Sequence, residues 1–388
     1  MDYGMKVETG EIPKPCNYAN TVLLGHSHLD HCGSLPILFQ KFSAPIYSTV
    51  VTHDLTNLLL KDSLKIARIE KKERFDEDDI NKVRQNQKRI TYGQQFETKS
   101  ATIDAFDAGH IPGSILYVTE AKGKRIMYTS DFKLETTRLV HGARIEDIKD
   151  IDVLIMESTY VNKEHPNRKE TERKFYQTVK DTVDNGGIAL IAAFAVGRSA
   201  ELLMILDEYG FDFPTYLDGM AREATLISLK YPEFIRDPKA LRKALEDVQH
   251  IYKNDERRKI VKEPCAIVTS AGMLEGGAVV SYMKYLYNNP QSAIIMTGFQ
   301  PPHTAGRNLL ETGRFVLDDI DLKVKMNVYY YDFSAHGGRS DLFEMVDRIN
   351  PQKIICMHGD ACDQFAKELN DKGYDAIAPF NGDTVQID

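Results

Sequence analysis

The amino-acid sequence predicts an α/β protein in which one domain is inserted into another. First, short apolar runs repeatedly end in a histidine or a carboxylate, both before residue 165 and after residue 325. Second, the stretch between these points alternates short apolar runs, glycine turns and helical segments, which is typical of a parallel sheet covered by helices. Third, 388 residues are more than one ordinary domain needs. We therefore expect a first domain over residues 1–165 and 326–388 and a second over residues 166–325.

The most distinctive stretch is residues 26–31, which follows the short apolar run at residues 21–24. It holds four potential metal ligands, namely His26, His28, Asp30 and His31. The chain has 11 histidines, so three of them in this short window are hard to ascribe to chance. A loop of this kind must point its donors at something, because buried charge without a partner is costly. We expect a divalent metal.

The composition describes a globular protein, with 42% hydrophobic and 27% charged residues. Because no run is apolar enough to span a membrane and no signal peptide opens the chain, we expect a cytoplasmic protein without membrane partners. The five cysteines are odd in number and scattered, and we interpret them as reduced thiols. The net charge of −8 argues against general nucleic-acid binding. Bound metals would add positive charge that this count omits.

The first domain begins, after the ligand loop, with a helix at residues 34–40 and a strand at residues 45–47. A long helical region from about Asp54 to Arg89 is interrupted by a charge run at residues 71–79. Strands follow at residues 101–106, 115–119, 125–128 and 151–156. The first, third and fourth of these lead to the polar residues His110, Asp131 and Glu157. Loops at one sheet edge could gather these side chains.

In the second domain, a helix over residues 175–183 precedes a strand at 188–192, and strands recur at 214–217, 266–269 and 293–296. Gly197 and Arg198 open a further helix, which suits either a phosphate site or an ordinary helix start. The last segment returns to the earlier pattern. An alternating strand at 328–333 leads to His336, a helix is capped by Ser340, and a strand at 353–357 leads to His358.

Residues 26–31 resemble the HxHxDH signature of the metallo-β-lactamase superfamily, and Glu157, His336 and His358 resemble motifs A, B and C of its β-CASP group. Residues 268–274 and 298–300 are also similar to that group. The resemblance implies a metallo-β-lactamase αββα sandwich with an inserted β-CASP α/β domain. It is strongest to prokaryotic homologues of the endonuclease subunit of the cleavage and polyadenylation specificity factor.

The sequence departs from this pattern in two places. Residues 1–4 read as the end of a strand, and the strands that precede it in the family are not in the sequence, so we expect a truncated or misassigned start. Residues 301–307 replace the usual Gly-Thr-Leu-Gly pattern, which leaves the substrate contacts of that loop open.

The resemblance implies two zinc ions, one held by His26, His28 and His110 and the other by Asp30, His31 and His358. Asp131 would bridge them, and Asp2 would support the ligand loop. Catalytic roles are implied for Asp30, Glu157 and His336, of which His336, oriented by Glu157, would protonate the leaving ribose oxygen. Substrate contacts are expected at three further residues, Arg198, Gly272 and Arg307.

The function implied is that of a zinc-dependent ribonuclease in RNA 3′-end processing or decay, with single-stranded RNA held between the domains. Endonuclease and 5′-exonuclease action both fit, and so do a monomer and a homodimer. A silent scaffold subunit, a DNA-directed β-CASP nuclease and a small-molecule thioesterase or lactonase are the alternatives. The complete set of ligand residues disfavours the scaffold, and the inserted domain disfavours the small-molecule enzyme.

Overall fold

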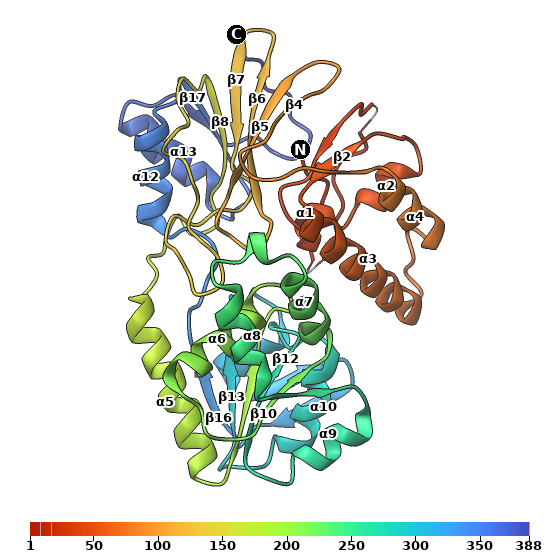
Figure 1. Cartoon of the computed structure of the whole chain (residues 1–388), viewed down its shortest axis with the longest axis vertical. Helices are drawn as coiled ribbons and strands as arrows, with labels where there is room; N and C mark the ends of the chain where they lie inside the picture. The colour runs from red at the N-terminus through yellow and green to blue at the C-terminus, as the bar shows by residue number, and fades with distance from the viewer. Residues whose placement is uncertain (8, 17, 388) are drawn as a thin grey trace. The chain divides into compact units, whose positions relative to one another are not determined.

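The computed structural model describes residues 1–7, 9–16 and 18–387. The chain forms two compact units (Figure 1). The first unit consists of Met1–Glu164 and Ala335–Asp388, and the second of His165–Ser334. No helix among the described residues is long and apolar enough to cross a membrane.

The first unit contains a three-stranded parallel sheet and a seven-stranded mixed sheet. The small sheet has the order β1 (Val22–Leu23), β2 (Ile46–Ser48) and β3 (Gln87–Arg89). The large sheet has the order β18 (Ala376–Ile377), β17 (Lys353–Met357), β8 (Val153–Glu157), β7 (Lys124–Tyr128), β6 (Ile115–Ala121), β5 (Thr102–Asp107) and β4 (Gln95–Glu97). The helices of the first unit are α1 (Leu29–Cys32), α2 (Leu35–Phe39), α3 (Val50–Glu70), α4 (Glu77–Gln85), α12 (Arg339–Ile349) and α13 (Cys362–Asp371).

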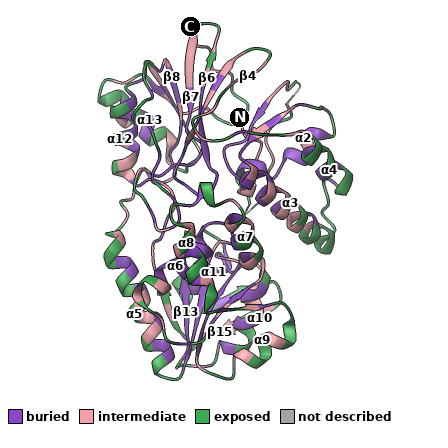
Figure 2. Cartoon of the chain, in the orientation of Figure 1, coloured by how far each residue is buried: buried purple, intermediate pink, exposed green. Residues whose placement is uncertain are grey.

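Three apolar clusters stack these elements into the expected αββα layers. Leu342 of α12 and Phe365 of α13 pack on Leu154 of β8, so these helices cover one face of the large sheet. Tyr117 of β6 and Leu23 of β1 share a cluster between the two sheets. Side chains of α2, α3 and α4 pack on the outer face of the small sheet. Most residues of β8 and β17 are buried, whereas the helices carry exposed residues on their outer faces (Figure 2).

Local chemistry explains where the long helices start and stop. Thr49 caps α3 by accepting from the Thr52 N–H at 3.2 Å, and the helix ends at Lys71 in the left-handed conformation, with φ 57°. A capping box between Asp76 and Asp79 starts α4. The charge run expected to break the helical region therefore does so by ending one helix and capping the next.

The second unit is built on a six-stranded parallel sheet in the order β11 (Val248–Ile251), β10 (Thr215–Asp218), β12 (Cys265–Thr269), β9 (Ile188–Ala192), β13 (Ala293–Met296) and β16 (Asn327–Tyr330). Strands β9, β12 and β13 are buried throughout, as in a sheet covered on both faces. The remaining elements are α5 (Arg168–Asp184), α6 (Arg198–Tyr209), α7 (Met220–Leu229), a 3₁₀ turn (Pro232–Phe234), α8 (Pro238–Glu246), α9 (Asn254–Ile260), α10 (Gly277–Leu286), α11 (Ala305–Thr312) and the hairpin β14 (Arg314–Leu317) and β15 (Ile320–Lys323).

Three local expectations are corrected by the structure. Strand β16 pairs with β13 of the second unit, so that unit runs to Ser334 and not to residue 325. Helix α12 begins at Arg339 after Gly338, whose N–H bonds the Asp341 carboxylate at 3.0 Å. Ser340, expected as the cap, instead donates to Glu164 Oε1 at 2.6 Å.

The first four residues were expected to end a strand, but they lie in none. They run alongside the ligand loop instead, since the Asp2 N–H bonds the Leu23 carbonyl at 2.9 Å and the Tyr3 N–H bonds the His31 carbonyl at 2.8 Å.

Candidate metal centre

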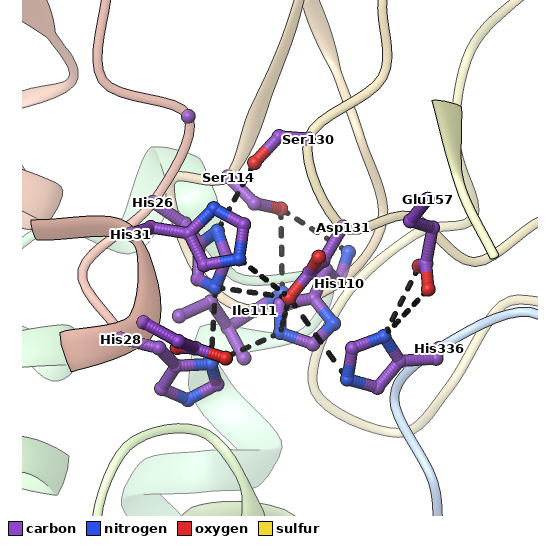
Figure 3. A network of polar contacts seen from close by, with 12 residues as sticks. His26, His28, His31, His110, Ile111, Ser114, Ser130, Asp131, Glu157 and His336 are labelled. Carbon is purple, nitrogen blue, oxygen red and sulfur yellow. Dashed lines mark hydrogen bonds and ion pairs between the residues drawn. The ribbon is translucent and has the colours of Figure 1, made fainter. Parts of the chain in front are cut away.

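Strands of both sheets of the first unit deliver polar side chains to one place. The loop after β1 carries His26 and His28 and runs into α1, which carries Asp30 and His31. The loops after β5, β7 and β17 supply His110, Asp131 and His358. Glu157 is the last residue of β8, and His336 lies shortly before α12. Figure 3 shows the labelled histidines and Asp131 pointing toward one another.

One group consists of His26, His28, His110 and Asp131. His28 Nδ1 lies 3.0 Å from His26 Nε2 and 3.2 Å from His110 Nε2. Asp131 Oδ2 is 3.4 Å from His26 Nε2 and 3.7 Å from His110 Nε2. Four donor atoms within 4.8 Å of one another can surround a single cation.

A second group consists of Asp30, His31, His358 and again Asp131. His31 Nε2 lies 3.1 Å from Asp131 Oδ2 and 3.2 Å from His358 Nε2, which is 3.3 Å from Asp30 Oδ2. Asp131 therefore belongs to both groups, as a ligand shared by two ions must.

His336 and Glu157 form a pair beside these groups. The two Glu157 oxygens lie 3.0 and 3.1 Å from His336 Nδ1, and His336 Nε2 is 3.9 Å from Asp131 Oδ2. Glu157 Oε1 also accepts from the Phe132 N–H at 2.9 Å. One imidazole nitrogen is thus held by a carboxylate while the other faces Asp131 (Figure 3).

The outer nitrogen of most of these histidines has a partner of its own. His26 Nδ1 is 3.2 Å from Ser130 Oγ, and His110 Nδ1 is 3.0 Å from the Ala335 carbonyl. His358 Nδ1 lies 3.3 Å from Thr159 Oγ1. Such outer partners fix the ring orientation and raise ligand basicity.

Asp2 is the outer partner of His31, because Asp2 Oδ2 lies 2.6 Å from His31 Nδ1. The Tyr128 hydroxyl donates to the same oxygen at 2.6 Å, and the Gly25 N–H donates to Asp2 Oδ1 at 2.7 Å. The residue expected to support the ligand loop therefore binds both its first residue and its last histidine.

The pKa values of the histidines in the two groups are shifted in opposite directions. Burial lowers the pKa of His26, His28 and His110, to about 4 for His28, so their nitrogens carry free lone pairs at neutral pH. Burial is the largest single cause and acts to lower the pKa of His31 and His358, but the surrounding carboxylates, Asp131 first, together outweigh it and raise both, to about 9 for His358.

The pKa values of Asp131, Asp30 and His336 are also shifted by their charged neighbours. Burial acts to raise the pKa of Asp131 and of Asp30, but the neighbouring histidines, His31 first, hold both well below the usual range. The pKa of His336 is raised, because the Glu157 and Asp131 charges outweigh its burial. These shifts favour the ionised form of Asp131 and Asp30 and the protonated form of His336.

Unpaired polar atoms show that these residues fit a metal. Asp131 is 1% exposed, yet neither carboxylate oxygen has a hydrogen-bond donor among the described residues. A neutral imidazole offers one donor and one acceptor, so the three close nitrogens of His26, His28 and His110 cannot all be satisfied by one another. A cation would satisfy the nitrogens and oxygens together, and this donor set is the one zinc prefers.

The three residues expected to contact substrate belong to the second unit. Arg198 is buried, and its Nη1 lies 3.1 Å from Glu201 Oε2. Gly272 packs so tightly that an added Cβ would lie 3.0 Å from the Phe194 nitrogen. Arg307 Nε lies 2.6 Å from Glu311 Oε1 on the surface of α11. A contact with substrate stays a prediction for all three.

Sequence reasoning missed the outer partners Ser130, Tyr128 and Thr159. Each lies within three residues of a predicted ligand or catalytic residue, and this closeness in the sequence is the signal that could have identified them. A hydroxyl beside a ligand is too common to single out without the fold.

Three family models match the chain. They are a metallo-beta-lactamase superfamily domain over residues 4–161, a Beta-Casp domain over residues 200–309, and a Zn-dependent metallo-hydrolase RNA specificity domain over residues 321–379.

Curated relatives cover the chain almost completely. Probable RNase MJ4 of Methanocaldococcus jannaschii is 37% identical over 394 aligned residues, which span 99% of this chain and 92% of that protein. RNase aCSPSF2 of Saccharolobus solfataricus is 36% identical, over 100% of this chain and 80% of that protein. The transcription termination factor FttA of M. jannaschii is 35% identical over 95% of this chain, which spans 63% of that longer protein.

Proposed function

This chain belongs to the β-CASP group of the metallo-β-lactamase superfamily, and we propose that it hydrolyses phosphodiester bonds of single-stranded RNA with two zinc ions. One observation carries the proposal. Asp131, whose buried oxygens have no hydrogen-bond donor among the described residues, is shared by two ligand groups and lies beside the Glu157–His336 pair. The names of the relatives, which are RNases and a transcription termination factor, support RNA as the substrate.

His26, His28 and His110 would hold one ion, Asp30, His31 and His358 the other, and Asp131 both. When bound, two zinc ions would acidify a water and neutralise charge on the phosphate oxygens, which is the chemistry that phosphodiester hydrolysis needs. The chain's own ligands prepare the site for this. Their outer hydrogen bonds hold the rings, and the lowered pKa values keep the first three histidines neutral.

His336 is proposed as the general acid. Its Nδ1–H donates to Glu157, and its Nε2–H faces the cluster, where it can give its proton to the leaving ribose oxygen. Asp30 is the most exposed carboxylate of the cluster, with 38% of its side chain accessible, and we assign it the orientation of the attacking water. These steps use groups already held in place.

We also propose a role in RNA 3′-end processing or decay in the cytoplasm. The five cysteines are all free, which suits a reducing compartment.

The deciding experiment uses the purified full chain with single-stranded RNA labelled at one end and carrying either a 5′ hydroxyl or a 5′ monophosphate. Internal products from both substrates mean endonuclease action, and mononucleotides released only from the monophosphate substrate mean 5′-exonuclease action. A DNA strand of the same sequence tests the alternative substrate. Cleavage of DNA but not RNA, or of neither when zinc is supplied, would overturn the proposal.

The acid assignment has its own test. His336→Ala should retain two zinc ions per chain but cleave RNA about 10² to 10⁴ times more slowly, because only the general acid is lost. Zinc content is measured by mass spectrometry of the digested protein. A variant that loses zinc would instead make His336 a ligand.

A further inference from the structure

A buried lysine lies directly behind the proposed acid. Lys133 follows Asp131 and Phe132 in the loop after β7 and is 2% exposed, among the largest fully buried side chains of the described residues. A buried ammonium is costly unless its donors are used. Its Nζ donates to the carbonyl oxygen of His336 at 3.2 Å and lies 3.7 Å from Glu135 Oε2.

The peptide group that Lys133 contacts is held from its other side as well. The carbonyl of His336 and the N–H of Gly337 belong to one peptide unit, and this N–H donates to the Phe132 carbonyl at 2.7 Å. Phe132 and Lys133 therefore bind both ends of the peptide that carries the imidazole. This fixes the plane of the peptide and with it the direction in which the His336 side chain leaves the main chain.

The same two residues also fix the partner of His336. The Phe132 N–H donates to Glu157 Oε1, the carboxylate that binds His336 Nδ1. The Lys133 N–H donates to the Ala108 carbonyl of the His110 loop at 3.0 Å, and the Lys133 carbonyl accepts from the Ala143 N–H, which precedes β8, at 2.7 Å. The segment is thus anchored by its own main chain, and the Lys133 side chain is left to act on the His336 peptide.

We propose that Lys133 is a positioning residue for the RNA cleavage reaction and acts by holding the His336 peptide so that Nε2 points at the leaving oxygen. The inference rests on the proposed function, because it needs His336 to be the acid. Lys133 takes no part in proton transfer.

The test is a double-mutant cycle with Lys133→Met and His336→Ala, alone and together, using the zinc-loaded full chain. Lys133→Met keeps the length of the side chain and removes the donor. We expect kcat on RNA to fall about 10- to 100-fold with KM unchanged. The double variant should be no slower than His336→Ala alone, because a lost acid cannot be mispositioned.

A second substrate separates this role from general damage. Bis(4-nitrophenyl) phosphate has a leaving group that departs without protonation, so Lys133→Met should cleave it at the wild-type rate. Zinc content, read independently of activity, should stay at two per chain. Lys149→Met, a change at an exposed lysine, is the matched control and should leave both rates unchanged.

Three outcomes would overturn the inference: additive losses in the cycle, an equal loss on the nitrophenyl substrate, or lost zinc. If Lys133→Met does not fold, Lys133→Leu, which also lacks the donor, replaces it in the same cycle, and additive losses there count equally against it. Full RNA cleavage by His336→Ala would instead refute the acid assignment of the proposed function, so the two failures are distinguishable.

Discussion

Two buried aspartates, one in each unit, follow or end an interior strand and yet have opposite surroundings. Asp218, at the end of β10, is 0% exposed, and every contact of its carboxylate is a donor. Arg257 binds it through Nε at 2.6 Å and Nη2 at 3.0 Å, the Tyr282 hydroxyl donates at 2.8 Å, and the Gly219 N–H donates as well. Asp131, after β7, is 1% exposed, and neither oxygen has a donor among the described residues.

The difference teaches how to separate a structural carboxylate from a functional one. Asp218 is satisfied by the fold, so its role is to tie β10 to α9 and α10. Asp131 has only imidazole nitrogens around it, at 3.1 to 3.9 Å, and these converge on it from four loops and a helix. A buried carboxylate with only imidazoles around it lowers the stability of the fold. Such a group is expected where a bound ligand supplies its missing contacts.

The largest expected effect comes from Asp131→Asn. Loss of the shared ligand should lower RNA cleavage by at least about 10³-fold and zinc content below two per chain, because both ligand groups lose a negative donor. The metal-free variant should still melt cooperatively by circular dichroism, because among the described residues only histidine nitrogens lie near this carboxylate. Asp147→Asn, on the surface, is the control. Full nuclease activity in Asp131→Asn would remove the basis of the comparison, and His28→Ala offers the same test on the other side of the first group.

Asp218→Asn should lower the stability of the second unit and leave the zinc content unchanged. Replacing the charge breaks its bidentate pair with Arg257, which costs about 3 kcal/mol in the unfolding of the second unit. The measurement is the first transition in urea unfolding, followed by tyrosine fluorescence. Zinc content should stay at the wild-type value. Asp212→Asn, whose side chain is 79% exposed, should change stability by less than about 0.5 kcal/mol. Loss of zinc from Asp218→Asn with unchanged stability would contradict the distinction.

Asp107 lies between these extremes, and its effect on stability is confined to one range of pH. Its buried carboxylate accepts from the Gly109 N–H at 2.9 Å, but burial raises its pKa to about 6. Below the unfolded pKa near 3.8 both states are protonated and the group costs nothing. As pH rises from there to about 6 the unfolded state ionises first, so folding loses about 3 kcal/mol, and the loss is complete above that pH.

The matched variant for this effect is Asp107→Asn, which cannot ionise. Its free energy of unfolding should equal that of the wild type near pH 4 and exceed it by up to about 3 kcal/mol at pH 8. Urea unfolding at both pH values measures the difference. An advantage that is independent of pH would mean that the amide stabilises by some other route.

The residues of the two proposed ligand groups could be named from the sequence because residues 26–31 and the residues after several strand ends resemble the motifs of the family. His26, His110 and His358 needed only a motif and a strand end. The αββα arrangement was implied by the resemblance to the metallo-β-lactamase superfamily, and the family models bear it out.

What could not be predicted depends on register and on main-chain geometry. Lys133 reaches His336 across about two hundred residues of sequence, through a carbonyl that no side-chain pattern reveals. Strand β16 was assigned to the wrong unit because its alternation suits either sheet, and only its pairing with β13 decides. That the Arg198 guanidinium is buried against Glu201 could not be predicted either, and its contact with substrate stays a prediction.

The central claim is that Asp131 is left open for two ions that the reaction requires. The most direct measurement is RNA cleavage by chelator-stripped chain as zinc is added back in known equivalents. The account predicts that the stripped chain is inactive and that the rate rises until two zinc ions per chain are bound. Undiminished cleavage by the stripped chain, or a rate that saturates at one equivalent, would contradict it.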